Sequence, residues 1–173
     1  RQLAVFIRFK GCNLNCQYCD TKWANEADAT AQQMTKEDIL EYVLSTGIKN
    51  VTLTGGEPLL RDGIEDVIEC LADNNLNVEI ETNGSIPLDN IRKLHKDNVT
   101  FTMDYKLSCS GMEQAMRMEN FSVLNKNDTV KFVAGCHEDL VRTKQIIEKY
   151  NLYGKCNLYI SPVFGMIEPE EIV

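Results

Sequence analysis

The sequence lacks the features that mark membrane-spanning and nucleic-acid-binding proteins. Its apolar runs are all shorter than the roughly 20 residues of a membrane-spanning helix, and no charged-then-apolar segment opens the chain. Basic residues occur singly or in scattered pairs, and 18 Lys and Arg stand against 26 Asp and Glu, a formal net charge of −8. We therefore expect no membrane span and no electrostatic binding to nucleic acid.

Internal repeats, low-complexity segments and interdomain linkers are also missing from the sequence. With 173 residues, 43% of them hydrophobic and 25% charged, we expect residues 1–173 to form a single globular domain with a sizeable core. The chain begins at Arg1 on a strand-like run and ends at Val173 in what resembles a helix start. We therefore expect short N- and C-terminal segments to lie outside this sequence.

Short β-branched or apolar runs alternate with helical patterns. The predicted strands are Leu3–Phe9, Val51–Thr54, Asn77–Thr82, Val99–Tyr105, Thr129–Val133 and Asn157–Ser161. The predicted helices are a capped one from Thr35 through Ser45, which stops at Gly47, and two over Asp62–Asp73 and Glu138–Tyr150. This alternation predicts parallel β/α units. The fold class is therefore α/β, a partial (β/α)6 TIM-like barrel with outer helices and its chemistry at the carboxyl ends of the strands.

Three cysteines, Cys12, Cys16 and Cys19, lie close together directly after the first predicted strand. Three thiolates on one loop can hold three irons of a cubane 4Fe-4S cluster and leave the fourth iron open to a small chelating molecule. A structural zinc site is the alternative, but zinc needs a fourth ligand, and no His or further Cys lies at close spacing. The odd total of seven cysteines and the need for thiolates favour a reducing compartment, the cytoplasm.

Polar motifs also follow the next three predicted strands. Gly55-Gly56-Glu57-Pro58 lets backbone approach a ligand closely and offers a carboxylate to a cation, although Gly-Gly alone is usually a turn. The segment Glu81–Gly84 offers two polar side chains, or simply a strand-to-loop turn closed by Asn-Gly. Asp104 and Lys106 are either site residues or a solvated ion pair.

The cysteine spacing, with the aromatic Tyr18 between the last two cysteines, resembles the signature of radical S-adenosylmethionine (SAM) enzymes. A longer set of motifs is similar to the 7-carboxy-7-deazaguanine synthase family. These motifs are Val5–Leu14, Cys19-Asp20-Thr21, Thr54–Leu60, Glu81–Gly84, Asp104-Tyr105-Lys106 and Ser110-Gly111-Met112. The resemblance implies a radical SAM carbon-nitrogen lyase that rearranges 6-carboxy-5,6,7,8-tetrahydropterin to 7-carboxy-7-deazaguanine with loss of ammonia, in queuosine and deazapurine biosynthesis.

The resemblance also implies cofactors, partners and site residues. It implies a 4Fe-4S cluster on Cys12, Cys16 and Cys19, a bound SAM and a Mg²⁺ at Thr21, with the chemistry done by a 5'-deoxyadenosyl radical and not by any side chain alone. The residues expected to bind SAM are Tyr18, Cys19, Asp20, Gly55, Gly56, Glu57, Glu81, Asn83, Asp104, Tyr105, Lys106, Ser161, Pro162, Val163 and Phe164. Arg8 and Thr54 are expected to contact the pterin, and flavodoxin or ferredoxin, together with a homodimer partner, are the expected protein partners.

Physical reasoning supports some of these roles and leaves alternatives to others. The charge of Arg8, on a predicted core strand, is costly there unless it meets a carboxylate such as that of the pterin. Thr21 offers a neutral oxygen suited to Mg²⁺, but it could equally cap a helix or turn. The rival functions are an activating enzyme that makes a glycyl radical on a partner protein and a non-catalytic iron-sulfur or zinc module.

The other cysteines do not form a second cluster in this interpretation. We expect Cys70, Cys109, Cys136 and Cys156 to be small hydrophobes or free thiols. Cys109 lies in Leu-Ser-Cys-Ser-Gly, where the resembled family has Leu-Pro-Ser-Ser-Gly. Trp23 is expected to pack the cysteine loop. His95 and His137 are expected at helix ends, and Met112, Met116 and Met118 on a helix face.

Overall fold

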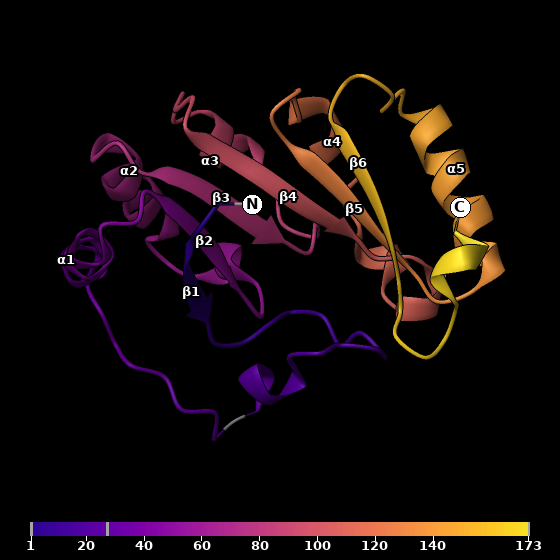
Figure 1. Ribbon diagram of the computed structural model, residues 1–173, viewed down its shortest axis with the longest axis horizontal. Helices are drawn as coiled ribbons and strands as arrows, with labels where there is room; N and C mark the ends of the chain where they lie inside the picture. Colours follow the sequence, from indigo (N-terminus) through magenta and orange to yellow (C-terminus); the bar gives the residue numbers. More distant parts are fainter. Residues whose placement is uncertain (1, 27, 173) are drawn as a thin grey trace. The chain divides into compact units, whose positions relative to one another are not determined.

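The computed structural model describes residues 2–26 and 28–172 and has an α/β fold (Figure 1). The strands take the order β1-β2-β3-β4-β5-β6. They are β1 Val5–Phe9, β2 Asn50–Gly55, β3 Asn77–Thr82, β4 Val99–Tyr105, β5 Thr129–Ala134 and β6 Asn157–Pro162. The helices are α1 Lys36–Thr46, α2 Ile64–Asp73, α3 Asp89–Arg92, α4 Asn120–Val123 and α5 His137–Lys149. Short 3-10 turns are η1 Lys22–Asn25, η2 Pro58–Leu60, η3 Ser108–Ser110, η4 Glu113–Ala115 and η5 Pro169–Glu171.

These elements confirm the predicted fold class. The bounds of β3 and β4 are those predicted from the sequence, and the other strands differ by one or two residues at an end. The helix α1 has the predicted capping box, in which Thr35 Oγ1 accepts from Asp38 N at 3.2 Å and Asp38 Oδ2 accepts from Thr35 N at 2.8 Å. It ends at the predicted Gly47, whose φ of 70° is the left-handed conformation typical of a helix end.

One compact unit comprises Arg1–Asn13, Thr21–Thr82 and Leu88–Phe101. Its strands β1, β2 and β3 pair in parallel, with Leu53 between Ile7 and Ile80. The strand β2 is buried along its four central residues because it has a neighbour on each side, whereas β1 alternates between buried and exposed positions. The helix α2 presents Ile64, Ile68 and Leu71 to the core of this unit.

The other compact unit comprises Leu14–Asp20, Asn83–Pro87 and Thr102–Val173. The strands β4, β5 and β6 pair in parallel. Alternation along β4 and β5 buries Tyr105 and Phe132, whose ring centroids are 5.5 Å apart. The helix α5 lies beside β5 (Figure 1). On β6, Tyr159 and Ile160 remain exposed.

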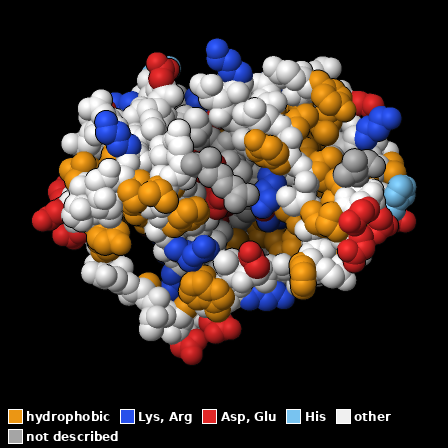
Figure 2. Space-filling model, viewed as in Figure 1, with side chains coloured by type: hydrophobic (Ala, Val, Ile, Leu, Met, Phe, Trp, Pro, Cys, Tyr) orange, Lys and Arg blue, Asp and Glu red, His pale blue; other side chains and the backbone are white. Residues whose placement is uncertain are grey.

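Within residues 2–26 and 28–172, no helix combines the length and apolar character needed to cross a membrane. Acidic and basic side chains are interspersed over the face shown in Figure 2. This distribution agrees with the scattered basic residues of the sequence.

Gly55, the last residue of β2, and the following Gly56 lie directly against the backbone that leads to Cys12. Gly56 N donates to Phe9 O at 3.0 Å and Glu57 N donates to Gly11 O at 2.9 Å. A Cβ on Gly55 would lie 2.2 Å from Phe9 O, and one on Gly56 would lie 2.0 Å from Gly11 O. From the sequence, we predicted that these glycines let the backbone approach a ligand closely. The structure shows that both positions also need glycine because backbone approaches backbone.

We predict that Gly56→Ala lowers the free energy of unfolding more than Gly47→Ala does. At Gly47 no described atom lies within 4 Å of an added Cβ, so the cost is mainly that of the left-handed backbone, about 1–2 kcal/mol. Gly56 does not have a left-handed backbone, but an added methyl there would lie 2.0 Å from Gly11 O and 2.3 Å from Gly11 C, so the Gly11 carbonyl would have to move. Urea unfolding of both variants measures the difference. A smaller loss for Gly56→Ala would contradict the backbone contact.

Candidate active site

The loop that carries Cys12 is fixed by main-chain and guanidinium contacts in the first unit. Gly11 N donates to Ala24 O at 3.0 Å, and the Arg61 guanidinium donates to Lys10 O. Cys12 itself is half-buried. The sequence analysis did not identify Arg61, because no motif distinguishes an arginine that supports a carbonyl from one exposed to solvent.

Glu57 is a fully buried carboxylate at the end of β2. Its Oε1 accepts from Leu59 N at 3.1 Å and from Thr82 Oγ1 at 3.0 Å. The first bond caps η2, and the second ties the end of β2 to the end of β3. These donors compensate part of the cost of burying the carboxylate, so Glu57 has a structural role besides its predicted contact with SAM.

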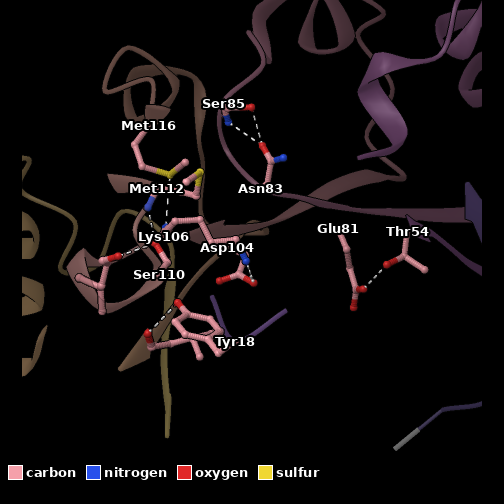
Figure 3. A network of polar contacts seen from close by, with 12 residues as sticks. Tyr18, Thr54, Glu81, Asn83, Ser85, Asp104, Lys106, Ser110, Met112 and Met116 are labelled. Carbon is pink, nitrogen blue, oxygen red and sulfur yellow. Dashed lines mark hydrogen bonds and ion pairs between the residues drawn. The ribbon is translucent and has the colours of Figure 1, made fainter. Parts of the chain in front are cut away.

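Thr54 and Glu81 lie on neighbouring strands, and Thr54 Oγ1 donates to Glu81 Oε2 at 2.7 Å (Figure 3). Arg8 is the Cα partner of Thr54 on β1, but its side chain is exposed. The expectation that Arg8 carries a buried charge was therefore wrong, because β1 is at the end of the strand order and, among the described strands, pairs only with β2. The Arg8 guanidinium lies 5.9 Å from the ring centroid of Trp23. Trp23 is 56% exposed, and its packing against the cysteine loop stays a prediction.

Thr21 precedes η1 and its carbonyl accepts from Ala24 N at 2.9 Å. Its side chain makes no capping hydrogen bond to the described residues of η1. The alternative role as a side-chain cap is therefore absent from this turn. The Mg²⁺ role stays a prediction.

The segment that carries Cys16 and Cys19 is anchored by its two intervening residues in the second unit. Gln17 N donates to Ser110 O at 3.0 Å, and Tyr18 Oη donates to Val133 O at 3.2 Å. Cys19 N donates to Cys16 O at 3.3 Å, which closes a turn between the two thiols. Burial, with smaller effects from the charges of Asp104 and Cys16, raises the pKa of Tyr18 well above its ordinary value, so its hydroxyl keeps the proton that it donates.

Asp104 and Lys106 form a half-buried ion pair at the end of β4, with Lys106 Nζ 2.7 Å from Asp104 Oδ2 (Figure 3). The side chains are 26% and 14% exposed, so the pair is not the solvated one considered as an alternative. Burial opposes the charge of Lys106, but the attraction of Asp104 and of the Cys16 and Cys19 sulfurs outweighs it and raises the pKa of the ammonium. Asp104 Oδ1 is buried without a hydrogen-bond partner among the described residues. Such an oxygen is available to a ligand donor.

Tyr105, between these two residues, points the other way. Its side chain is 1% exposed, and its hydroxyl donates to Glu113 Oε1 at 3.0 Å. Arg142 Nε lies 2.6 Å from the same Glu113 oxygen. The ring of Tyr105 is therefore a core group, and the contact of Tyr105 with SAM stays a prediction.

The remaining predicted SAM residues of the second unit lie after β3 and at the end of β6. Ser161 and Pro162 are the last two residues of β6, and Val163 and Phe164 follow it. Asn83 Oδ1 accepts from Ser85 N at 2.9 Å and from Ser85 Oγ at 2.6 Å, and Gly84 has a φ of 75° (Figure 3). The predicted turn at Asn83-Gly84 is thus present. After β6, Val163 is buried and its N donates to Ala134 O at 2.8 Å, whereas the side chain of Phe164 is fully exposed.

The structure brings together three groups that the sequence analysis left apart. The sulfurs of Cys109 and Cys136 are 2.7 Å apart, and a carboxylate oxygen of Asp139 lies within 4.8 Å of both. Burial, with hydrogen bonds to Cys136 and Asp139, raises the pKa of the Cys109 thiol to about 12. The methionines also differ from prediction, since Met112 and Met116 flank the 3-10 turn η4 and do not share a helix face.

Comparison with known proteins identifies the family. The model of the radical SAM superfamily matches residues 6–106. A 7-carboxy-7-deazaguanine synthase of Clostridium acetobutylicum is 57% identical over 99% of this chain and 78% of its own length. The synthase of Chlorobaculum tepidum is 34% identical over 95% of this chain and 73% of its own length.

Solved structures agree on the fold. SuiB of Streptococcus suis, in its complex with the precursor peptide SuiA, has a TM-score of 0.65 at 14% identity and covers 92% of this chain and 39% of its own. The same protein bound to S-adenosylmethionine has a TM-score of 0.65 at 13% identity, over 96% of this chain and 40% of its own. The sequence matches are much closer, and with the cysteine motif they show that the chain belongs to the 7-carboxy-7-deazaguanine synthase family of radical SAM enzymes.

Proposed function

We propose that this chain rearranges 6-carboxy-5,6,7,8-tetrahydropterin to 7-carboxy-7-deazaguanine with loss of ammonia. The observation that carries the proposal is the 57% identity to a 7-carboxy-7-deazaguanine synthase over nearly the whole chain. When bound, a 4Fe-4S cluster and SAM supply radical hydrogen-atom abstraction. The chain's own residues hold these groups and orient the pterin.

The donor sets fit both cofactors. All seven cysteines in the described part of the chain are thiols, and Cys12, Cys16 and Cys19 are the proposed cluster ligands. The unpartnered Asp104 Oδ1 is a buried acceptor suited to a hydroxyl or amino donor of SAM, and Lys106 forms an ion pair with the other oxygen, Oδ2.

The substrate site is proposed to use the exposed Arg8 guanidinium and the Thr54 hydroxyl. Arg8 is free to form a bidentate contact with the pterin carboxylate, and its position over Trp23 limits the orientations of the guanidinium. Thr21 is the proposed protein ligand of a Mg²⁺ that keeps waters and takes substrate oxygens.

The proposed partners are a flavodoxin or ferredoxin as electron donor and a second copy of this chain. Exposed apolar side chains on and after β6, namely Tyr159, Ile160 and Phe164, support a homodimer contact. The proposed compartment is the cytoplasm, because the cluster ligands must remain thiolates.

Cluster assembly is expected to fail in Cys16→Ala and to proceed in Cys70→Ala. Cys16 belongs to the three-cysteine loop, whereas Cys70 lies in α2 outside it. Anaerobic reconstitution followed by iron counting and charge-transfer absorbance measures both. A normal 4Fe-4S content in Cys16→Ala would contradict the assignment of Cys16 as a cluster ligand.

Asp104→Asn is expected to weaken SAM binding by roughly 10- to 100-fold, the loss that follows removal of a hydrogen bond to a charged group. The matched control is Asp89→Asn, because Asp89 pairs with Lys93 at 2.9 Å on the exposed surface. Equilibrium dialysis of SAM against the cluster-loaded proteins gives the two affinities. Equal affinities would show that Asp104 serves only Lys106.

The reaction itself is tested by anaerobic incubation of the protein with the pterin, SAM, Mg²⁺ and a reductant. Mass spectrometry should detect 7-carboxy-7-deazaguanine. Arg8→Ala should raise KM more than it lowers kcat, because the pterin carboxylate loses its partner, and Arg8→Lys should lie between it and the parent. SAM cleavage without a deazapurine, together with a glycyl radical on a co-expressed protein, would favour the activating-enzyme alternative.

A further inference from the structure

Cys109 and Cys136 form a thiol pair that the proposed reaction does not use. Cys109 lies in η3 after β4, and Cys136 is the residue before α5. Their sulfurs are 2.7 Å apart, and both residues are half-buried. This sulfur–sulfur distance is shorter than ordinary packing between two thiols and approaches the roughly 2.05 Å length of a disulfide bond.

The backbone, and not only the side-chain rotamers, brings these sulfurs together. One buried carboxylate binds both segments, because Asp139 Oδ1 accepts from Cys109 N at 3.3 Å while Asp139 Oδ2 accepts from Gly135 N at 2.9 Å. Asp139 Oδ1 also accepts from Ser108 Oγ at 2.6 Å. A Cβ on Gly135 would lie 2.9 Å from Cys109 Cβ, so the absence of a side chain there permits the approach.

We propose that Cys109 and Cys136 are a reversible modification site that forms an intrachain disulfide in the folded protein. The oxidant is a low-molecular-weight disulfide such as oxidised glutathione. One cysteine sulfur attacks it and releases one small thiol. The other cysteine sulfur then attacks the mixed disulfide and releases the second small thiol. The protein loses two protons and two electrons, and the oxidant is reduced to two thiols.

A metal ion fits these groups less well. Two thiolates on one tetrahedral Zn²⁺, each about 2.3 Å from the metal, lie farther apart than these sulfurs do. Both oxygens of Asp139 already accept from protein donors. A metal would therefore have to separate the sulfurs and compete with the bonds that hold the two segments.

The disulfide would join the two segments that anchor the cysteine loop of the second unit. Ser110, next to Cys109, offers its carbonyl to Gln17 N, and Val133, three residues before Cys136, offers its carbonyl to Tyr18 Oη. Gln17 and Tyr18 are the residues between Cys16 and Cys19. The link therefore ties together the supports of two proposed cluster ligands and should slow the opening of that loop.

The test uses the cluster-loaded protein in anaerobic buffers with a rising ratio of oxidised to reduced glutathione. After alkylation and trypsin digestion, the parent and a Cys70→Ser control should lose two alkylatable thiols and yield Leu107–Arg117 linked to Phe132–Arg142. Cys109→Ser and Cys136→Ser should yield no such linked peptide. Because the linked peptide is detected in the parent protein itself, the result does not depend on whether either variant folds.

Retention of both alkylatable thiols in the parent at every ratio would overturn the proposal. So would protection of both thiols that a chelator reverses without the mass loss of two hydrogens, since that outcome indicates a metal. In the linked protein, release of cluster iron to a chelator should be several-fold slower than in the reduced parent, and equal rates would overturn the effect on the loop. Formation of the disulfide is measured separately from formation of the deazapurine. A failure of the proposed reaction can therefore be told apart from a failure of the disulfide proposal.

Discussion

Main-chain hydrogen bonds to the cysteine loop are the contacts on which the candidate site depends. In the first unit, Gly56 and Glu57 donate to the backbone that precedes Cys12. In the second unit, the segment with Cys16 and Cys19 is held by the carbonyls of Ser110 and Val133. These contacts use main-chain groups and the Tyr18 hydroxyl, so they fix where the loop runs while they leave the thiol side chains available for a cluster. This explains why glycine is needed at positions that bear no chemistry of their own.

The hydrogen bonds of the carboxylates Glu57, Asp139 and Asp104 distinguish those with a structural role from the one suited to bind a ligand. Glu57 and Asp139 have 0% exposure and accept from neighbouring backbone and hydroxyl donors. Asp104 differs, because one oxygen pairs with Lys106 and the other has no partner among the described residues. An unsatisfied buried oxygen costs free energy unless a ligand completes it. Of the three carboxylates, Asp104 therefore has the strongest physical case for a contact with SAM.

Much of the fold and of the candidate site could be predicted from the sequence, because these features depend on patterns of residues close together in the chain. The capping box at Thr35 and the turn at Asn83-Gly84 use residues within four positions of one another. Alternation along β4 likewise places Asp104 and Lys106 opposite the buried ring of Tyr105. The radical SAM motif is equally local, and the family followed from it and from short segments after the strands.

Tertiary contacts explain what sequence reasoning missed. The exposure of Arg8 depends on the place of β1 at the end of the described strand order, and the support of Lys10 O by Arg61 joins residues 51 positions apart. The pairing of Cys109 with Cys136 depends on Asp139, which sits in the first turn of α5 where an acidic residue is ordinary. No spacing rule links a 3-10 turn after one strand to a helix start after the next.

The charge of Asp139 also decides which state of the thiol pair the second unit can hold. Burial opposes that charge, but hydrogen bonds from Gly135, Ser108 and Cys109 outweigh it and lower the pKa of the carboxyl. The same group helps to raise the pKa of the Cys109 thiol, so Asp139 carries the negative charge and the Cys109 sulfur keeps its proton. Two thiolates would add negative charge beside a buried carboxylate. A disulfide adds none. The oxidised pair gives up the thiol hydrogen bond to Asp139 but keeps those from the Cys109 and Gly135 amides and the Ser108 hydroxyl, through which Asp139 holds both segments.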